Sequence, residues 1–268
     1  NQEADFDDDS CEYPNNGDYS LSFDGIDDYI EINDSPLLDG MPEISIQTNI
    51  YVHEFSDGQD QSYTILAKDD TQGAGGNMAY SLYWTHEPSS NANFIGFGIK
   101  TTQGFQGNSF NASDVPHNEW INITATYDGL TSKIYLNGEL QNEESQSGDI
   151  LANDYSLKFG THFNGSMALD GYIENIKILN IALDESELNN SSAYSENLIG
   201  LWKFSQGPDG TQDGILIDHS GNQNHGIING ATWIENIEGC TDEYACNFTD
   251  GATIDNGSCE YNDLCGEC

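Results

Sequence analysis

The sequence predicts an all-β protein, an antiparallel β-sandwich of jelly-roll type followed by a small disulfide-rich module. Many short segments alternate apolar and polar side chains, as strands with one buried face do, and clusters of Gly, Asn and Asp separate these segments. The 268 residues are 36% apolar, which is enough for a core. Cysteines crowd into the C-terminal end.

The first two strands are expected within residues 19–32, YSLSFDGIDDYIEI. Tyr19, Leu21 and Phe23 alternate with serines, which is the period of a half-buried strand. An Asp-Gly pair then signals a tight turn, and the alternation resumes after it. The stretch therefore predicts two short strands joined by an acidic turn.

Further strands follow along most of the chain. One short helix is expected at 184–188, where Asp184 can cap the N-terminus and Glu187 stands at the capping-box spacing. Residues 198–234 contain too few strands to bury a core alone, so we expect them to complete the sandwich. Many short strands without intervening helices favour a sandwich or jelly roll. The strands before this region are expected at 44–52, 62–68, 78–85, 94–100, 120–127, 133–136, 157–160 and 171–179.

The charge of the chain is strongly one-sided. It has 46 acidic residues and six basic ones, all lysines, for a net charge of −40. Such a surface repels phosphate backbones, which argues against nucleic acid as a partner. No apolar run reaches the length of a membrane span, so we expect no direct membrane insertion. The acids either keep the surface solvated or bind cations, and calcium is the cofactor that such oxygen ligands favour.

The six cysteines lie at the two ends of the chain. A long stretch without cysteine separates the first from the others, which fits oxidised, extracellular end modules around a disulfide-free core. The single CxxC at the C-terminus is also compatible with zinc or a redox pair. The candidate disulfide residues are Cys11, Cys240, Cys246, Cys259, Cys265 and Cys268.

A short internal repeat indicates how the chain is organised. The tetrapeptide SCEY at 10–13 recurs at 258–261, which predicts a slice through an array of alternating domains. We expect residues 1–17 to be the acidic tail of a preceding cysteine-containing repeat and 18–236 to be the sandwich. Residues 237–268 then form a small acidic cysteine-rich module, which needs disulfides or metal to fold. Neighbouring domains of the same large protein are therefore expected partners.

A series of motifs runs through residues 18–235, and together they resemble laminin-G-like domains of the concanavalin-A-like lectin superfamily. The resemblance implies a jelly-roll sandwich. The C-terminal GCTDEYACNFTDGATIDNGSCEY resembles a GCTD-type repeat of secreted multidomain bacterial proteins, which implies an extracellular or cell-surface location. The sandwich motifs are LSFDGIDDYIEI at 21–32, WINITATYDG at 120–129, IYLNG at 134–138, GYIENI at 171–176, GLWKF at 200–204, DHSGN at 218–222 and GATW at 230–233.

The resemblance also implies a calcium site. Its ligands in the family come from the opening acidic turn and from an acid on a later strand, which correspond here to Asp24 and Glu174. Asp27 or Asp28 can add a ligand. The later acid departs from the family pattern, because Glu replaces Asp and the following residue is Asn. The alternative is that Asp24 only caps the turn.

Two further groups of acids are candidate calcium ligands. One has alternate spacing near the N-terminus, and the other lies in the end module. The alternative for the N-terminal group is a disordered acidic linker. The residues are Asp5, Asp7 and Asp9, and Asp242, Asp250 and Asp255.

Glycan recognition needs aromatic platforms and polar hydrogen-bonding groups on a concave face or loop rim. The best candidates are Tyr83, Trp84 and His86. Gly- and Asn-rich loops at 72–77, 87–93 and 103–108 can line such a site. Trp120 and Trp202 occupy positions that are core positions in the resembled family, so they are expected to pack inside.

Catalysis has little support in the sequence, so we expect no enzyme. No Glu-x-Asp-x-Glu run, nucleophile elbow or phosphate loop occurs. The chain is expected to be a non-catalytic extracellular binding module, for calcium-dependent adhesion or glycan recognition. The alternatives are a structural spacer of a surface fibre and an accessory carbohydrate-binding domain of a polysaccharide-degrading enzyme. The expected partner is a glycan or another cell surface.

Overall fold

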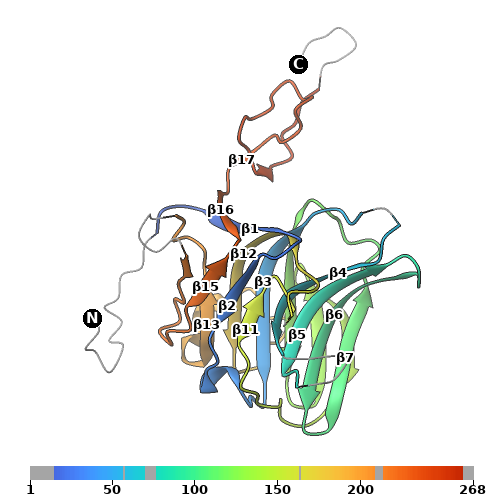
Figure 1. Ribbon diagram of the computed structural model, residues 1–268, viewed down its shortest axis with the longest axis vertical. Coiled ribbons are helices and arrows are strands. Elements are labelled where there is room, and N and C mark those ends of the chain that lie inside the picture. Colours follow the sequence, from blue (N-terminus) through green and yellow to red (C-terminus); the bar gives the residue numbers. More distant parts are fainter. Residues whose placement is uncertain (1–14, 57, 70–76, 163, 209–213, 262–268) are drawn as a thin grey trace.

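Two antiparallel β-sheets pack face to face and enclose one hydrophobic core (Figure 1). The computed structural model describes residues 15–56, 58–69, 77–162, 164–208 and 214–261. The predicted all-β sandwich is confirmed. Among the described residues no helix is long and apolar enough to cross a membrane.

The first sheet is organised around β12 (Asp170–Leu179), which pairs with three other strands. The order of this sheet is β10 (Glu139–Ser145), β9 (Thr131–Leu136), β8 (Trp120–Tyr127), β3 (Ile44–Val52), β12, β1 (Tyr19–Asp24) and β16 (Thr232–Glu235), with β13 (Leu198–Trp202) also paired to β12. Its inner face carries the apolar residues of each alternation, such as Ile46 and Ile50 on β3. Its outer face carries the polar and aromatic ones.

The second sheet closes the core from the other side. Its order is β14 (Ile215–Leu216), β15 (Gly226–Asn229), β2 (Tyr29–Ile32), β11 (Leu157–Phe159), β4 (Gln61–Lys68), β5 (Tyr80–Glu87), β6 (Ala92–Thr101) and β7 (Gly104–Asn111). The strands after residue 198 extend both sheets, since β13 and β16 join the first sheet and β15 joins the second. A small parallel pair, β17 (Glu238–Gly239) and β18 (Ile254–Asp255), follows the sandwich.

Two expectations about local structure are wrong. Of residues 103–108, expected as a loop, residues 104–108 belong to β7, because their backbone pairs with β6. The segment expected as a helix forms consecutive turns instead. The capping-box contacts exist, since the Asp184 N–H donates to Glu187 Oε2 (2.8 Å) and the Ser186 N–H to Asp184 Oδ1 (2.8 Å). The backbone bonds within the segment join residues three apart, however, and a 3₁₀ segment follows at Ser191–Asn197.

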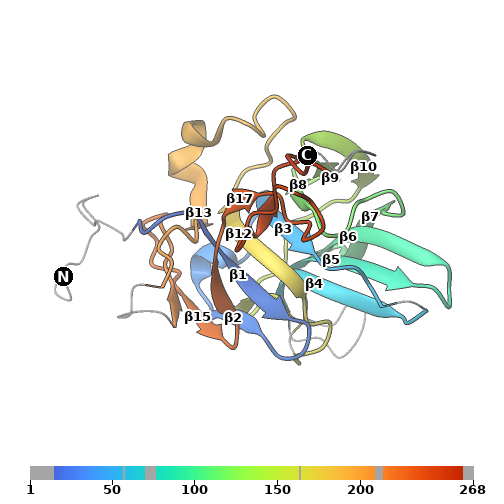
Figure 2. The same ribbon diagram turned by 90° about the horizontal axis from the view of Figure 1, so that it is seen from above.

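These turns lie on the outer face of the first sheet. Leu183 and Leu188 pack with Tyr135 and Leu179 in a second, smaller apolar cluster. Gln47 on β3 donates to the Leu188 carbonyl (3.0 Å). The segment stands on the side of the first sheet that faces away from the second sheet (Figure 2). It covers one end of that face.

The end module contains the expected disulfide chemistry. Cys240 and Cys259 form a disulfide, and Cys246 is disulfide-bonded as well. The remaining candidates, Cys11, Cys265 and Cys268, lie outside the described residues.

One cation is buried at the edge of the core. The Lys68 side chain is fully buried, and its ammonium lies 2.6 Å from Asp34 Oδ1 and 3.2 Å from Asp39 Oδ1. It also donates to the backbone oxygens of Asn153 (3.1 Å) and Tyr155 (2.7 Å). Removing one partner of a buried ion pair leaves the other uncompensated.

We therefore expect Lys68→Met to lower the free energy of unfolding by about 3 kcal/mol. Urea denaturation followed by tryptophan fluorescence measures this change. The control is Lys203→Met at an exposed position, which should stay within about 0.5 kcal/mol of the parent. Equal stabilities of the two variants would contradict the role assigned to Lys68.

Candidate functional site

Three aromatic side chains form a row across the outer face of the first sheet. Tyr172 on β12 pairs with Tyr51 on β3, which pairs in turn with Trp120 on β8. The Tyr51 ring centroid lies 5.1 Å from that of Tyr172 and 5.9 Å from that of Trp120. All three are half-buried, so each ring keeps part of its surface open to solvent. We call these residues the aromatic row.

The position of Trp120 corrects an expectation, because it was expected in the core. Trp202 is in the core and fully buried, but Trp120 points outward. The alternation of β8 explains why: Ile121 and Ile123 are buried on the inner face, so Trp120 and Asn122 fall on the other. Trp120 Nε1 has no hydrogen-bond partner among the described residues. The two-residue alternation of β8, applied from Ile121 and Ile123, predicts the outward position of Trp120.

Two residues further along the strands, the same face carries amide side chains, and we call this row of cross-strand neighbours the next rung. Asn122 Nδ2 donates to Asn49 Oδ1 (2.7 Å), and Asn49 Nδ2 donates to Glu174 Oε2 (2.8 Å). Asn175 Nδ2 lies 3.5 Å from the same carboxylate oxygen. Burial raises the pKa of Glu174, while the hydrogen bond from Asn49 opposes that shift. The amides are thus held in fixed orientations beside one half-buried acid.

A groove of about 630 Å³ lies over this rung and is bounded by the turn segment that follows β12. It contains two of the six lysines of the chain, Lys177 on β12 and Lys203 just after β13. Lys177 Nζ donates to Gln47 Oε1 (3.2 Å). Burial lowers the pKa of Lys177, and the charge of Lys203 lowers it further. The lining residues are Gln47, Asn49, Asn122, Asn175, Lys177, Leu188, Asn189, Tyr194, Ser195, Leu198, Leu201 and Lys203.

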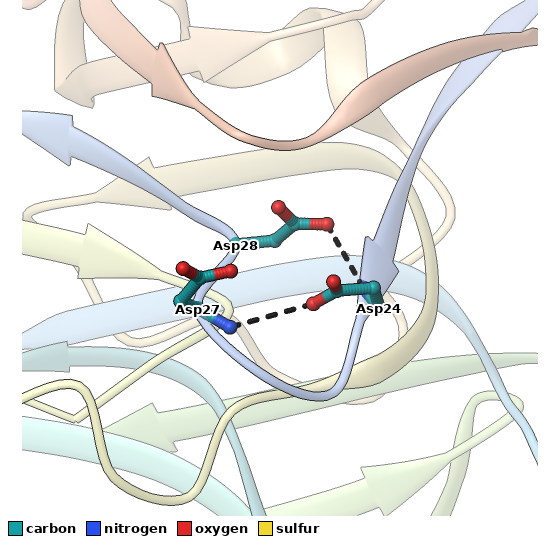
Figure 3. Close-up of side chains that lie close together, drawn as sticks. All are labelled: Asp24, Asp27 and Asp28. Carbon is teal, nitrogen blue, oxygen red and sulfur yellow. Dashed lines mark hydrogen bonds between the residues drawn. The ribbon is translucent and has the colours of Figure 1, made fainter.

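The acidic turn between β1 and β2 brings together three of the predicted metal ligands (Figure 3). Carboxylate oxygens of Asp24, Asp27 and Asp28 all lie within 4.8 Å of one another. Asp28 Oδ2 accepts from the Asp24 N–H (2.9 Å), and Asp24 Oδ1 accepts from the Ile26 N–H (2.8 Å). Burial raises the pKa of Asp28, and the neighbouring charges of Asp24 and Asp27 add to the shift. Because Asp24 accepts from the Ile26 N–H, it also caps the turn, which was the alternative to metal binding.

Glu174 does not belong to this cluster, contrary to expectation. The register of β1 and β12 sets Asp170 opposite Asp24, and Asp170 Oδ1 lies 2.6 Å from His53 Nδ1. Glu174 is the residue skipped by the β3–β12 register where it shifts between Ile173 and Asn175, and its carboxylate turns to Asn49. A sequence pattern cannot reveal such a bulge.

The other predicted metal ligands are not brought together. Among the described residues the only group of three close acidic or metal-binding side chains is the acidic turn, so Asp242, Asp250 and Asp255 form no such group. Asp242 Oδ2 instead accepts from the Tyr261 hydroxyl (2.6 Å), a bond that lowers the pKa of Asp242. Asp5, Asp7 and Asp9 lie outside the described residues.

Tyr83, Trp84 and His86 lie on β5 and were expected to contact one ligand together, but their side chains lie in three different environments. Tyr83 lies on the outer face of the second sheet, against Gly96, where a Cβ atom would come within 2.6 Å of the ring. His86 lines a hollow of about 550 Å³ together with Phe94 and part of the 87–93 loop. Trp84 is fully buried and stacks on His117 at 4.7 Å, so its expected role in ligand contact is wrong.

Comparisons with known proteins agree with this architecture. A family model described as "Concanavalin A-like lectin/glucanases superfamily" matches residues 24–189. A candidate carbohydrate binding protein from Bacteroides ovatus has a TM-score of 0.57 at 16% identity, and the match covers 82% of this chain and 60% of that chain. This chain thus spans less than two thirds of the length of that protein. At this identity the likeness shows the fold alone.

Two other similar structures have lower scores. The CBM40 of a Ruminococcus gnavus IT-sialidase, bound to α2,3-sialyllactose, has a TM-score of 0.48 at 16% identity, covering 63% of this chain and 95% of that one. A SAP-like pentraxin from Limulus polyphemus has a TM-score of 0.48 at 12% identity, covering 63% and 79%. A search of curated proteins gives no match.

The burial of Trp84 leads to a prediction about stability. Trp84→Ala should lower the free energy of unfolding by about 3–5 kcal/mol, because it opens a cavity and removes the donor to Asn93 Oδ1. Thermal and urea unfolding measure the effect. Phe105→Ala is the control, since that ring is 41% exposed on β7. An unchanged midpoint for Trp84→Ala would show that the indole does not support the core.

Proposed function

This chain belongs to the concanavalin A-like lectin/glucanases superfamily, and from that premise we propose that it is a non-catalytic glycan-binding module. The observation that carries the proposal is the outer face of the first sheet. There the aromatic row lies one rung from a groove lined by amides. Aromatic rings offer a flat apolar surface with large contact area, and amides donate and accept the hydrogen bonds that hydroxyl groups need.

The groove supports binding rather than hydrolysis. Glycoside hydrolysis requires two carboxyl groups on either side of the scissile bond. The described residues that line the groove include no Asp or Glu. Glu174 lies beside it, but its Oε2 is occupied by the amide of Asn49.

We propose calcium as the cofactor, bound at the acidic turn. Three carboxylates this close repel one another, and a divalent cation would relieve that repulsion. The turn is also connected to the aromatic row. Asp170, opposite Asp24, pairs with His53, and the His53 ring lies 5.1 Å from Tyr172. A bound ion would therefore fix the end of the sheet that holds the row.

We further propose an extracellular location within a larger protein. Disulfides form and persist in oxidising compartments, and the end module contains the Cys240–Cys259 bond. The alternative is a structural spacer that binds no ligand, and the following experiment distinguishes it from a glycan-binding module.

Trp120→Ala should weaken glycan binding by about 30-fold or more, because truncation of an aromatic residue that anchors a ligand costs about 2 kcal/mol. A polysaccharide array followed by calorimetry on the best binder measures this. The matched control is Phe105→Ala, which removes an exposed ring from the other sheet. Loss of binding with Phe94→Ala, but not with Trp120→Ala, would move the site to the hollow beside His86. No binding to any glycan would favour the spacer.

Calcium at a hundredfold excess over its dissociation constant should add about 2.7 kcal/mol of stability, a rise of roughly 5–10 °C in the melting temperature. Differential scanning calorimetry with calcium, magnesium or chelator at fixed ionic strength measures the shift. Asp27→Asn should abolish most of it, whereas Asp114→Asn, at an exposed acid outside the cluster, should keep it. The same rise with magnesium would contradict a calcium-selective site.

A further inference from the structure

We propose that the groove on the first sheet binds an acidic glycan, with a carboxylate or sulfate ester of the sugar held between Lys177 and Lys203. The proposal rests on the proposed glycan-binding function and adds the chemical class of the ligand. Four sets of observations carry it: the distribution of charge, the face on which the two lysines lie, the ion pairs of the described residues, and the distance to the aromatic row.

Positive charge is rare on this chain, and a third of its lysines line the groove. Only six lysines stand against 46 acidic residues, yet two of them line one groove whose described lining includes no acid. By contrast, Lys68 is neutralised by Asp34 and Asp39. A groove with two cations and no anion on a surface of opposite sign is a local site for an anionic group.

Strand pairing sets both lysines on the same face. Lys177 pairs with Leu201, and Ile176 pairs with Trp202, whose side chain is in the core. Lys203 is the next residue after Trp202, so by the alternation of the strand it points outward, as Lys177 does. The two charges are close enough that Lys203 contributes to lowering the pKa of Lys177. An anion between them would remove this repulsion.

Among the described residues, no acid lies within ion-pair distance of either lysine. Within the described part of the chain, the ion pairs shorter than 4.0 Å involve His53, Lys68 and His162, and none includes Lys177 or Lys203. Glu174 is engaged by Asn49. Glu187 pairs with the hydroxyl of Tyr194, a contact that raises the pKa of Tyr194 to about 12. The lysine charges therefore remain available to a ligand.

The aromatic row and the lysines lie within reach of one polymer. On β3 the outward residues run Tyr51, Asn49, Gln47, and Gln47 accepts from Lys177. Four residues of strand span about 13 Å, at ~3.3 Å per residue. A chain of several sugar rings can therefore lie across the aromatic row while its acidic group reaches the lysines. A small inorganic anion would use only one end of this surface.

The test uses polysaccharides paired with their own neutralised forms. A highly esterified pectin, whose free galacturonates are sparse, is compared with its fully methylated form, and a sparsely sulfated galactan is compared with its desulfated form. An array of neutral glycans is tested beside them. Titration calorimetry at fixed ionic strength gives the affinities. We expect at least one acidic member to bind the parent protein about tenfold or more tightly than its neutralised partner, which corresponds to one charge-assisted hydrogen bond. The pair that shows the difference identifies the group as carboxylate or sulfate.

Substitutions assign the difference to the groove. Lys203→Gln, at an exposed position, should remove most of the preference by lowering the affinity for the acidic form towards that for the neutralised form, while the melting temperature stays unchanged. The double variant Lys177→Gln/Lys203→Gln should abolish the preference. Lys158→Gln is the control with the same change in net charge, on β11 of the other sheet.

The outcomes separate this inference from the proposed function. Equal affinity for acidic and neutralised forms, with binding still lost in Trp120→Ala, overturns the acidic ligand and leaves the glycan-binding function standing. A preference that survives in Lys203→Gln and in the double variant places the anion elsewhere and also overturns the inference. No binding to any member of the array overturns both.

Discussion

The pairing of β12 with β3 is the constraint on which the outer face depends. Along this one strand, Asp170 meets the acidic turn, Tyr172 joins the aromatic row, Asn175 joins the amides and Lys177 enters the groove. The pairing itself needs glycine at 171, where φ is +153° and a Cβ atom would lie 2.0 Å from the Tyr51 carbonyl oxygen. A side chain there would push β12 away from β3 and separate Tyr172 from Tyr51. Backbone packing thus fixes the spacing of the proposed site.

Local signals in the sequence were sufficient for much of the fold. Apolar alternation located the central strands, and the Asp24-Gly25 turn brought three acids together because all of them lie within five residues. The acidic strand β10 has no apolar alternation that would predict a strand, because most of its side chains face solvent. The capping box at Asp184 formed as expected but did not extend into a helix. Its neighbours Leu183 and Leu188 pack onto the sheet instead.

The candidate site depends on relations that a linear pattern does not contain. Glu174 matched a motif, but the shift in strand register turned it toward Asn49. Trp84 was favoured for its neighbours in sequence, although the alternation of β5 buries it between Tyr83 and Thr85. The resemblance predicts a core position for Trp120, but the alternation of β8 sets its side chain on the outer face. The groove joins β3, β8 and β12, which are far apart in the sequence and adjacent only in the sheet, with β13 paired to β12.

A net charge of −40 is at first sight an obstacle to an acidic ligand. The repulsion is a long-range effect, however, and at physiological ionic strength charges separated by more than ~8 Å are largely screened. At contact the groups that matter are those within the groove, where Lys177 and Lys203 face no acid among the described lining residues. The acidic surroundings then act as a filter. A polymer with closely spaced charges meets repulsion wherever it leaves the groove, whereas one with a single acidic group on an otherwise neutral chain does not. The same charge distribution that permits an acidic ligand therefore favours a sparsely charged one, with neutral sugars over the aromatic row and one anion at the lysines.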